Sequence, residues 1–199
     1  KPTKNFITTG KKVAVVGSGP AGLAAAAQLN KAGHEVVVFE RDDQIGGLLR
    51  YGIPDFKLDK KIIDRRIDVM KASGIEFKVN AEVGKNISSA ELLAFDAVIL
   101  ATGSTVPWHL DIPGHDLNGV HFAMDFLKQQ NKEVSGIAIN ETRLLATDKH
   151  VVVIGDGDTG SDCIGTSNRQ LAKSITQIAR KPTPAQERLK NTPWPLDKV

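Results

Sequence analysis

The sequence predicts an α/β fold in which parallel strands alternate with helices. Three observations predict it. Short β-branched runs recur along the chain, segments with helical periodicity follow them, and two of the strand-to-helix junctions are glycine-rich loops. Strands that alternate with helices are typical of parallel sheets with flanking helices. The apolar share of 41% in 199 residues is enough for a hydrophobic core.

The first half of the chain shows most of the expected elements. The predicted strands lie at residues 13–16, 36–39, 75–79 and 97–101. The predicted helices lie at residues 21–33 and 58–74. The second of these helices has a wet face, and its apolar residues are Ile62, Ile63, Ile67 and Met70.

The second half begins with a crossing segment marked by Pro107, Pro113 and Gly114. A helix is expected at residues 120–131. From His150 onward the order strand, loop, helix, strand repeats, with the last strand at residues 175–179. The two halves therefore share a βαβ plan, which indicates duplication of a domain type.

The first glycine loop, VAVVGSGPAG, has the form G-x-G-x-x-G between a strand and a helix. In this motif Gly17 makes the tight turn, Gly19 lets the backbone approach a pyrophosphate, and Gly22 allows close packing of helix and strand. The helix N-terminus attracts the phosphates. Glu40 closes the next strand, where the motif places an acid for the ribose hydroxyls.

The second loop, VVVIGDGDTG, repeats the motif with Gly155, Gly157 and Gly160. Its following strand ends at Arg180–Lys181, where the first unit has Glu40. A carboxylate suits a free 2′-hydroxyl, whereas a guanidinium suits a 2′-phosphate. The first site is therefore predicted to take FAD or NAD and the second NADP. We interpret the pair as one loop for a resident flavin nucleotide and one for a nicotinamide nucleotide that brings electrons.

Several segments carry a closer resemblance: GSGPAGLAAA, the FER after the second strand, IGGLLRYGIPDFKL, FDAVILATGS, GDGDTGSDCIGTSNRQ and PWPL. Together they resemble the small (β) subunit of NADPH-dependent glutamate synthase, over nearly the whole chain from Lys12. The resemblance implies a truncated glutathione-reductase-like flavoprotein with two Rossmann-like dinucleotide-binding domains. It also implies that hydride passes from NADPH to FAD, and that electrons continue through iron–sulfur clusters to a large subunit, which makes glutamate from glutamine and 2-oxoglutarate.

The resemblance implies residues for both cofactors. FAD would be held by Gly17, Ser18, Gly19, Pro20, Ala21, Gly22, Glu40, Arg41, Gly46, Gly47, Leu48, Arg50, Val83, Ala101, Thr102 and Gly103. NADPH would be held by Gly155, Gly157, Asp158, Thr159, Gly160, Arg180 and Lys181. The expected domains are an FAD-binding part at residues 1–112 and an incomplete NADPH-binding part at residues 113–199.

The chain departs from the family pattern in three ways. Asp156 stands where the family usually has glycine, which places a carboxylate near a phosphate site. The segment IARKPTPAQERL differs from the commoner acidic, leucine-rich version. Compared with the family, we expect the cysteine-rich N-terminal domain and the later segment that covers the flavin to lie outside this sequence. We therefore expect a fragment that does not turn over by itself.

Other classes of function are disfavoured. Lys and Arg are scattered, so no nucleic-acid partner is expected, and no apolar run is long enough for a membrane span. The lone cysteine, Cys163, is interpreted as a buried apolar residue. The histidines lack metal spacing, and no catalytic set is expected because the cofactor carries the chemistry. With no secretory signal before the first strand, a cytoplasmic location is expected.

Two alternatives stay open at this point. One is a fragment of another FAD- and NADPH-dependent electron-input flavoprotein, as in pyrimidine-reducing enzymes. The other is a nucleotide-binding or docking module that kept the fold without turnover. The intact RYGIPDF segment favours the enzyme lineage, and the missing segments favour an inert module.

Overall fold

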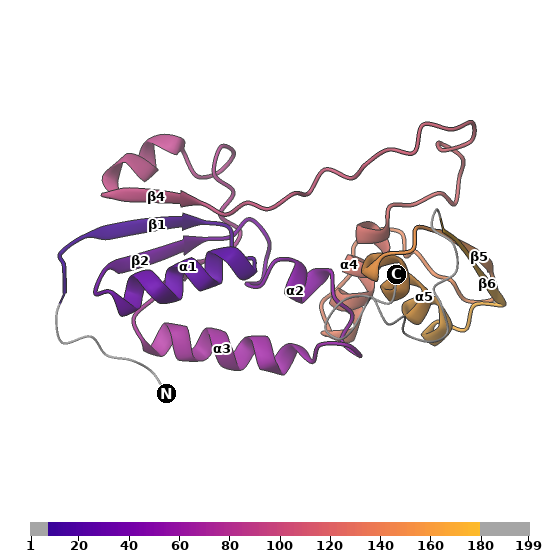
Figure 1. Cartoon of the computed structure of the whole chain (residues 1–199), viewed down its shortest axis with the longest axis horizontal. Coiled ribbons are helices and arrows are strands. Elements are labelled where there is room, and N and C mark those ends of the chain that lie inside the picture. The colour runs from indigo at the N-terminus through magenta and orange to yellow at the C-terminus, as the bar shows by residue number, and fades with distance from the viewer. Residues whose placement is uncertain (1–7, 180–199) are drawn as a thin grey trace, which may run out of the picture. The chain divides into compact units, whose positions relative to one another are not determined.

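The computed structural model describes residues 8–179, and its main feature is a four-stranded parallel sheet (Figure 1). Its strands are β1 (Lys12–Val16), β2 (Glu35–Phe39), β3 (Glu76–Lys78) and β4 (Ala97–Leu100). They lie in the order β3-β2-β1-β4. The chain therefore runs from β1 outward to β3 and then returns to the opposite side of β1, which confirms the predicted α/β architecture.

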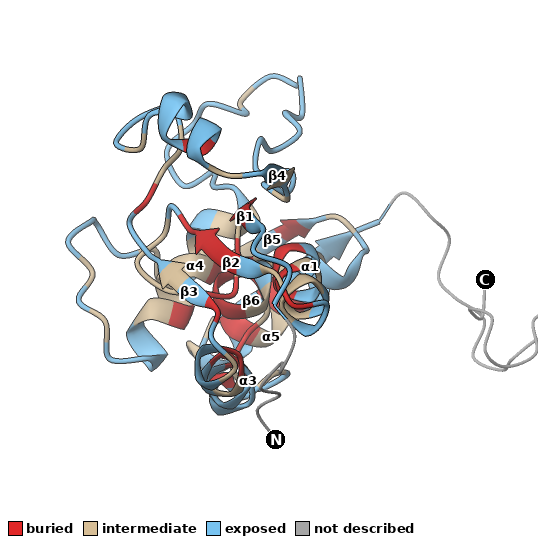
Figure 2. Cartoon of the chain, turned by 90° about the vertical axis from the view of Figure 1, so that its left-hand side faces the viewer, coloured by how far each residue is buried: buried red, intermediate tan, exposed pale blue. Residues whose placement is uncertain are grey.

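One face of this sheet is covered by helices α1 (Pro20–Lys31) and α3 (Lys60–Ala72). Their apolar sides join Val15, Val36 and Val38 in one core, and Figure 2 shows buried residues on the strands and on these helices. Helix α3 contributes Ile63, Ile67 and Met70 as predicted, but the side chain of Ile62 is 51% exposed. Ile62 lies about 100° around the helix from Ile63, which turns it toward solvent.

Local signals explain where these helices start and stop. Pro20 occupies the first turn of α1, where its missing N–H costs nothing, and the Asp59 carboxylate caps α3 by accepting from the Lys61 N–H. Each helix ends in the same way. The N–H of His34 donates to the Leu29 carbonyl after α1, and the N–H of Ile75 donates to the Met70 carbonyl after α3. These bonds belong to the Schellman ending, which satisfies otherwise open helix carbonyls.

The opposite face of the sheet carries a second, smaller core around Ala14, Val16 and Phe39. It is covered by the short 3₁₀ helix η1 (Ser89–Ala94), which buries Leu92. A capping box between Ser88 and Glu91 starts this helix.

Two further helices complete the first of two compact units, which divide between Leu144 and Leu145. Helix α2 (Leu48–Tyr51) follows the Gly46–Gly47 pair, and helix α4 (Ala123–Val134) packs against α2. The predicted helix at residues 120–131 is thus present with shifted ends. The predicted boundary between residues 112 and 113 divides the chain by the nucleotide that each part binds. The compact units divide it by packing, and the first unit extends through α4. The boundary by nucleotide therefore stays a prediction.

The second unit repeats the βαβ plan on a smaller scale. Strand β5 (His150–Ile154), helix α5 (Asp158–Arg169) and strand β6 (Ser174–Ile178) follow one another, and the two strands pair in parallel. Both strands carry exposed apolar side chains, among them Val152 and Ile178. Among the helices between residues 8 and 179, none has the length and apolar character that a bilayer span requires.

Candidate functional site

The predicted FAD residues gather at the carboxyl-terminal edge of the four-stranded sheet. The first glycine loop follows β1, Glu40 follows β2, and Ala101–Thr102–Gly103 follow β4. β1 and β4 are neighbours although β2 and β3 separate them in sequence. Open α/β sheets bind ligands outside the carboxyl ends of strands at such a switch point. The topology therefore places this switch point at the edge of the sheet where the sequence predicts the FAD site.

Two of the loop glycines are required by close packing. Gly17 has φ +103°, and a Cβ there would come 2.3 Å from the Ala101 carbonyl oxygen. A Cβ on Gly22 would come 2.0 Å from the Gly17 carbonyl oxygen. The N–H of Gly17 also donates to the Phe39 carbonyl at 2.8 Å, which ties the loop to the end of β2. No side chain fits at either position, so the turn and the helix start are packed directly against each other and against the end of β4.

Gly19 differs, because a Cβ there would meet no atom within 4 Å. It is the N-cap of α1 and supplies no side-chain cap, and no acidic residue lies in the first turn. The Gly47 backbone lies directly beside it, since a Cβ on Gly47 would come 2.9 Å from the Gly19 Cα. The result is a side-chain-free cradle at the positive end of a helix, which suits a pyrophosphate.

Glu40 has a second role that the motif does not predict. It is 5% exposed, and its Oε2 accepts from the Ser18 N–H at 3.0 Å and from the Ser18 hydroxyl at 2.5 Å. Its Oε1 accepts from the Asp42 N–H at 2.8 Å. The Ser18 hydroxyl in turn accepts from the Gly46 N–H at 2.9 Å. Glu40 thus joins the glycine loop, the end of β2 and the Gly46–Gly47 turn, and these bonds use three of the roughly four acceptor positions of its carboxylate.

Several other predicted FAD residues lie outside this brace, the hydrogen-bond network of Glu40 and Ser18. Arg41 is exposed beside Glu40, and the side chain of Leu48 is 53% exposed at the start of α2. Val83 packs against the smaller core. Thr102 and Gly103 are exposed beyond β4, and their contacts with a nucleotide stay predictions.

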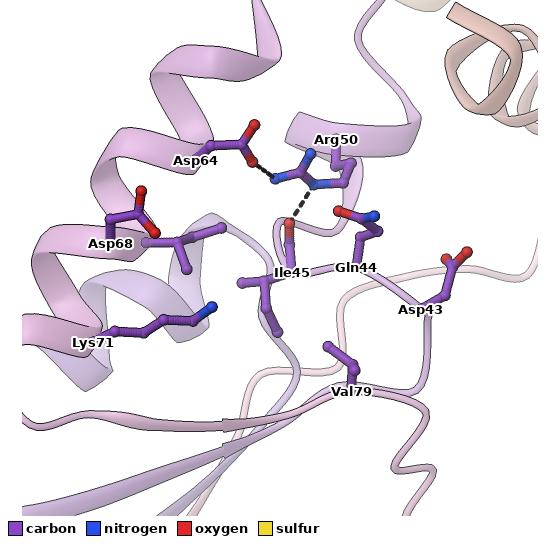
Figure 3. Close-up of a pocket in the computed structure, with 9 residues that line it drawn as sticks. Asp43, Gln44, Ile45, Arg50, Asp64, Asp68, Lys71 and Val79 are labelled. Atoms are coloured by element: carbon purple, nitrogen blue, oxygen red, sulfur yellow. Dashed lines mark hydrogen bonds and ion pairs between the residues drawn. The ribbon is translucent and has the colours of Figure 1, made fainter. Parts of the chain in front are cut away.

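The resemblance places Arg50 beside the pyrophosphate and flavin, and in the structure its guanidinium is bound within the protein. Its Nε donates to the Ile45 carbonyl at 2.6 Å, and a terminal nitrogen forms an ion pair with Asp64 at 2.5 Å (Figure 3). A cavity of about 340 Å³ next to this pair is lined also by Asp68 and Lys71 of α3. Arg50 is the only predicted FAD residue that lines it, so this cavity is separate from the glycine cradle.

The second glycine loop is built like the first. The N–H of Gly155 donates to the Ile178 carbonyl at 2.9 Å, as Gly17 does to Phe39. A Cβ on Gly160 would come 2.6 Å from the Gly155 carbonyl oxygen, whereas one on Gly157 would meet nothing within 4 Å. Gly157 is the N-cap of α5 and likewise supplies no side-chain cap. The second loop thus repeats the strand-end hydrogen bond and the close packing of the third glycine, but a Cβ on Gly155, unlike one on Gly17, would meet no atom within 4 Å.

The second loop carries more negative charge than the first. Asp156 and Asp158 are both exposed, and Asp158 lies in the first turn of α5 beside Thr159. Carboxylates at this helix end compete with a phosphate for the same backbone N–H groups. The basic residues that would counter them, Arg180 and Lys181, lie outside the described residues.

Cys163 is the candidate nucleophile that remains. Cys163 is buried on α5, and its burial, reinforced by the nearby Asp162, raises the pKa of the thiol to about 11. It therefore stays a thiol at neutral pH, which agrees with its interpretation as a small core residue. Within residues 8–179, no three His, Cys, Asp or Glu side chains form a group that could hold a metal ion.

Curated relatives share most of this chain. A glutamate synthase [NADPH] small chain from Mycobacterium tuberculosis is 53% identical over 94% of the chain and 39% of that protein. The Escherichia coli glutamate synthase [NADPH] small chain is 44% identical over 87% of the chain and 37% of that protein. A glutamate synthase [NADH] from Schizosaccharomyces pombe is 53% identical over 94% of the chain and 9% of that protein. The chain thus spans about two fifths of the length of the small chains it matches.

A solved structure and a family assignment agree with this. The structure of Mycobacterium tuberculosis FprA in complex with NADPH superposes with a TM-score of 0.70 at 26% identity, covering 86% of this chain and 44% of FprA. Residues 11–192 match the family described as pyridine nucleotide-disulphide oxidoreductase. With two glycine loops of one construction and a match over most of its length, the chain belongs to the pyridine nucleotide-disulphide oxidoreductase family.

Proposed function

We propose that this chain is the FAD- and NADPH-binding part of a glutamate synthase small subunit. In this role hydride passes from NADPH to FAD, and electrons continue to a large subunit for glutamate synthesis from glutamine and 2-oxoglutarate. The observation that carries the proposal is the doubled glycine loop in one chain. Its first copy is joined to a strand-end carboxylate, Glu40, by two hydrogen bonds from Ser18. Relatives named glutamate synthase small chain support the assignment of substrate.

The residues present fit an FAD nucleotide at the first loop. Gly19 leaves open backbone where a pyrophosphate is expected, Gly47 packs against Gly19 without a side chain, and the helix N-terminus supplies partial positive charge. Glu40 retains an acceptor position for a ribose hydroxyl and its negative charge repels a 2′-phosphate. When bound, FAD supplies the redox chemistry, and the chain's own residues bind and orient it.

Binding is measured on the chain itself, and turnover in a chimera. FAD titration of the 199-residue chain should show one site. For turnover, the chain replaces the matching segment of the Mycobacterium tuberculosis small chain, which is 53% identical. The chimera should bleach its flavin when NADPH is added without oxygen. Binding of both nucleotides without flavin reduction would favour the non-catalytic module, and absence of FAD binding would overturn the proposal.

The preference for NADPH should depend on Arg180. A guanidinium contact with the 2′-phosphate is strong and directional, so Arg180→Glu should raise the KM for NADPH at least about tenfold and change that for NADH little. The measurement is made in the same chimera, with Lys181→Glu and Arg188→Glu as comparisons. The names of the relatives do not decide which nicotinamide nucleotide is preferred, because one relative at 53% identity is named [NADH] and another at 53% is named [NADPH]. Equal effects on both nucleotides would assign the 2′-phosphate to another basic residue.

A further inference from the structure

One face of helix α4 is bound to the segment that follows β2. Lys128, Asn131 and Lys132 have the i, i+3, i+4 spacing that places side chains on one side of a helix. The Lys128 ammonium pairs with Asp42 at 2.7 Å, and the Lys132 ammonium pairs with Asp43 at 3.4 Å. These contacts join distant parts of the first unit: Lys128 and Asp42 lie 86 residues apart in the sequence.

Tyr51 is the anchor of this contact. Its side chain is buried, and its backbone carbonyl accepts from the Asn131 amide at 3.1 Å. Both lysine ammoniums lie over its ring, at 5.3 Å for Lys128 and 5.5 Å for Lys132. Its hydroxyl donates to Asp43 at 2.5 Å, and burial together with this bond raises the pKa of Tyr51 above its ordinary value. The two lysines therefore share one aromatic ring but have different carboxylate partners.

Of the two carboxylate residues, Asp42 also forms a hydrogen bond with Glu40. The Asp42 N–H donates to Glu40 Oε1 at 2.8 Å, while the Asp42 side chain accepts from Lys128. The Asp42 carbonyl also accepts from the Asn80 N–H at 2.9 Å, so the residue is held on three sides. The Asp43 carboxylate instead accepts from the Tyr51 hydroxyl and pairs with Lys132. Asp42 is thus the direct connection between α4 and the strand-end carboxylate.

We propose that Lys128 is a positioning residue for Glu40, and that through Asp42 it couples the docking of helix α4 to nucleotide binding at the first glycine loop. This inference rests on the proposed function for its ligand. By holding the Asp42 side chain, Lys128 fixes the N–H that orients Glu40 Oε1, the oxygen with an acceptor position for the ribose. The coupling is reciprocal, so a bound nucleotide strengthens α4 docking by the same factor.

The test compares two variants of the same helix face. Lys128→Met should raise the Kd of FAD roughly fivefold, the size expected for a partly exposed ion pair, and Lys128→Arg should restore it. Lys132→Met is the matched control, because it also removes one ion pair and one cation–π contact with Tyr51. The two methionine variants should have similar Tm values, and the control should keep its FAD affinity. Equal losses of affinity would overturn the proposal.

A double-mutant cycle separates positioning from general loosening. In a Glu40→Gln background, Lys128→Met should have little further effect on FAD binding, because its target is already altered; additive effects would contradict the proposal. If the wild-type chain binds no FAD, that result overturns the proposed function but does not test the connection from Lys128 through Asp42 to Glu40. Hydrogen exchange without ligand tests that connection. The Ser18 and Asp42 amide protons should exchange faster in Lys128→Met than in Lys132→Met. Equal exchange rates would refute the connection.

Discussion

Gly22→Ala should lower the free energy of unfolding by about 2–4 kcal/mol, although alanine is the better helix former. Gly22 lies in the first turn of α1, where helix propensity alone favours alanine by about 1 kcal/mol. The new Cβ, however, would lie 2.0 Å from the Gly17 carbonyl oxygen, a backbone atom that cannot rotate away. The free-energy cost of this overlap with the backbone exceeds the gain in helix propensity, so the substitution should destabilise the fold. Urea unfolding of wild type and variant gives the difference.

Gly19→Ala is the control in the same loop and should show the opposite pattern. Its Cβ would meet no atom within 4 Å, and its backbone, at φ −64° and ψ 179°, is open to alanine. Stability should change by less than about 1 kcal/mol, because lower entropy of the unfolded chain offsets a poorer N-cap. FAD affinity should fall at least about tenfold, because the methyl group occupies the backbone approach to the pyrophosphate. A stable variant with unchanged FAD affinity would place the pyrophosphate elsewhere.

The parts of the site that the sequence predicts well are those with local causes. A G-x-G-x-x-G loop between a strand and a helix imposes its own geometry. In both copies the first glycine has a positive φ, and a Cβ on the third glycine would overlap the carbonyl oxygen of the first. Alternation of strands and helices also predicts that β1 and β4 end at the same edge of the sheet. The position of the cradle therefore follows from short stretches of sequence.

The connections between distant segments could not be predicted in this way. Nothing in the sequence near Asp42 indicates that its side chain meets Lys128, because the pairing depends on how a helix far along the chain packs. The brace from Glu40 to Ser18 is similar: the motif explains an acid at that position by a ligand, while the structure adds protein donors. Side-chain networks depend on three-dimensional neighbours that periodicity does not specify.

Burial was also only partly predictable. The strands predicted at β4 and β5 consist largely of apolar residues, yet Leu100 is 74% exposed and Val152 is 58% exposed. β4 pairs with β1 alone, and in the described residues β5 pairs with β6 alone. An apolar strand is buried only when other elements cover its faces, and a hydrophobic pattern does not identify those elements.

Glu40→Ala is expected to have the second large effect, because it removes two functions together. The Ser18 N–H, the Ser18 hydroxyl and the Asp42 N–H would all lose a charged acceptor. Leaving such donors unpaired in a buried site should lower the free energy of unfolding by about 3 kcal/mol. FAD binding should weaken in addition by on the order of 2–3 kcal/mol, the worth of a pair of charge-assisted hydrogen bonds. Calorimetric titration and urea unfolding measure the two losses separately.

Two comparisons separate the brace from the ribose contact. Ser18→Ala removes the hydroxyl between Glu40 and the Gly46 N–H but keeps the carboxylate, so it should lower stability while retaining more FAD affinity than Glu40→Ala. Glu40→Gln keeps the side-chain volume and removes the charge. A carboxylate at the ribose should make wild type bind ADP more tightly than adenosine 2′,5′-bisphosphate, and Glu40→Gln should narrow that difference because charge repulsion of the 2′-phosphate is lost. If Glu40 has only a structural role, Glu40→Gln should weaken the binding of both nucleotides by the same factor, because hydrogen bonds within the protein do not distinguish a 2′-hydroxyl from a 2′-phosphate. The ratio of the two affinities is therefore the quantity that assigns Glu40 to the nucleotide.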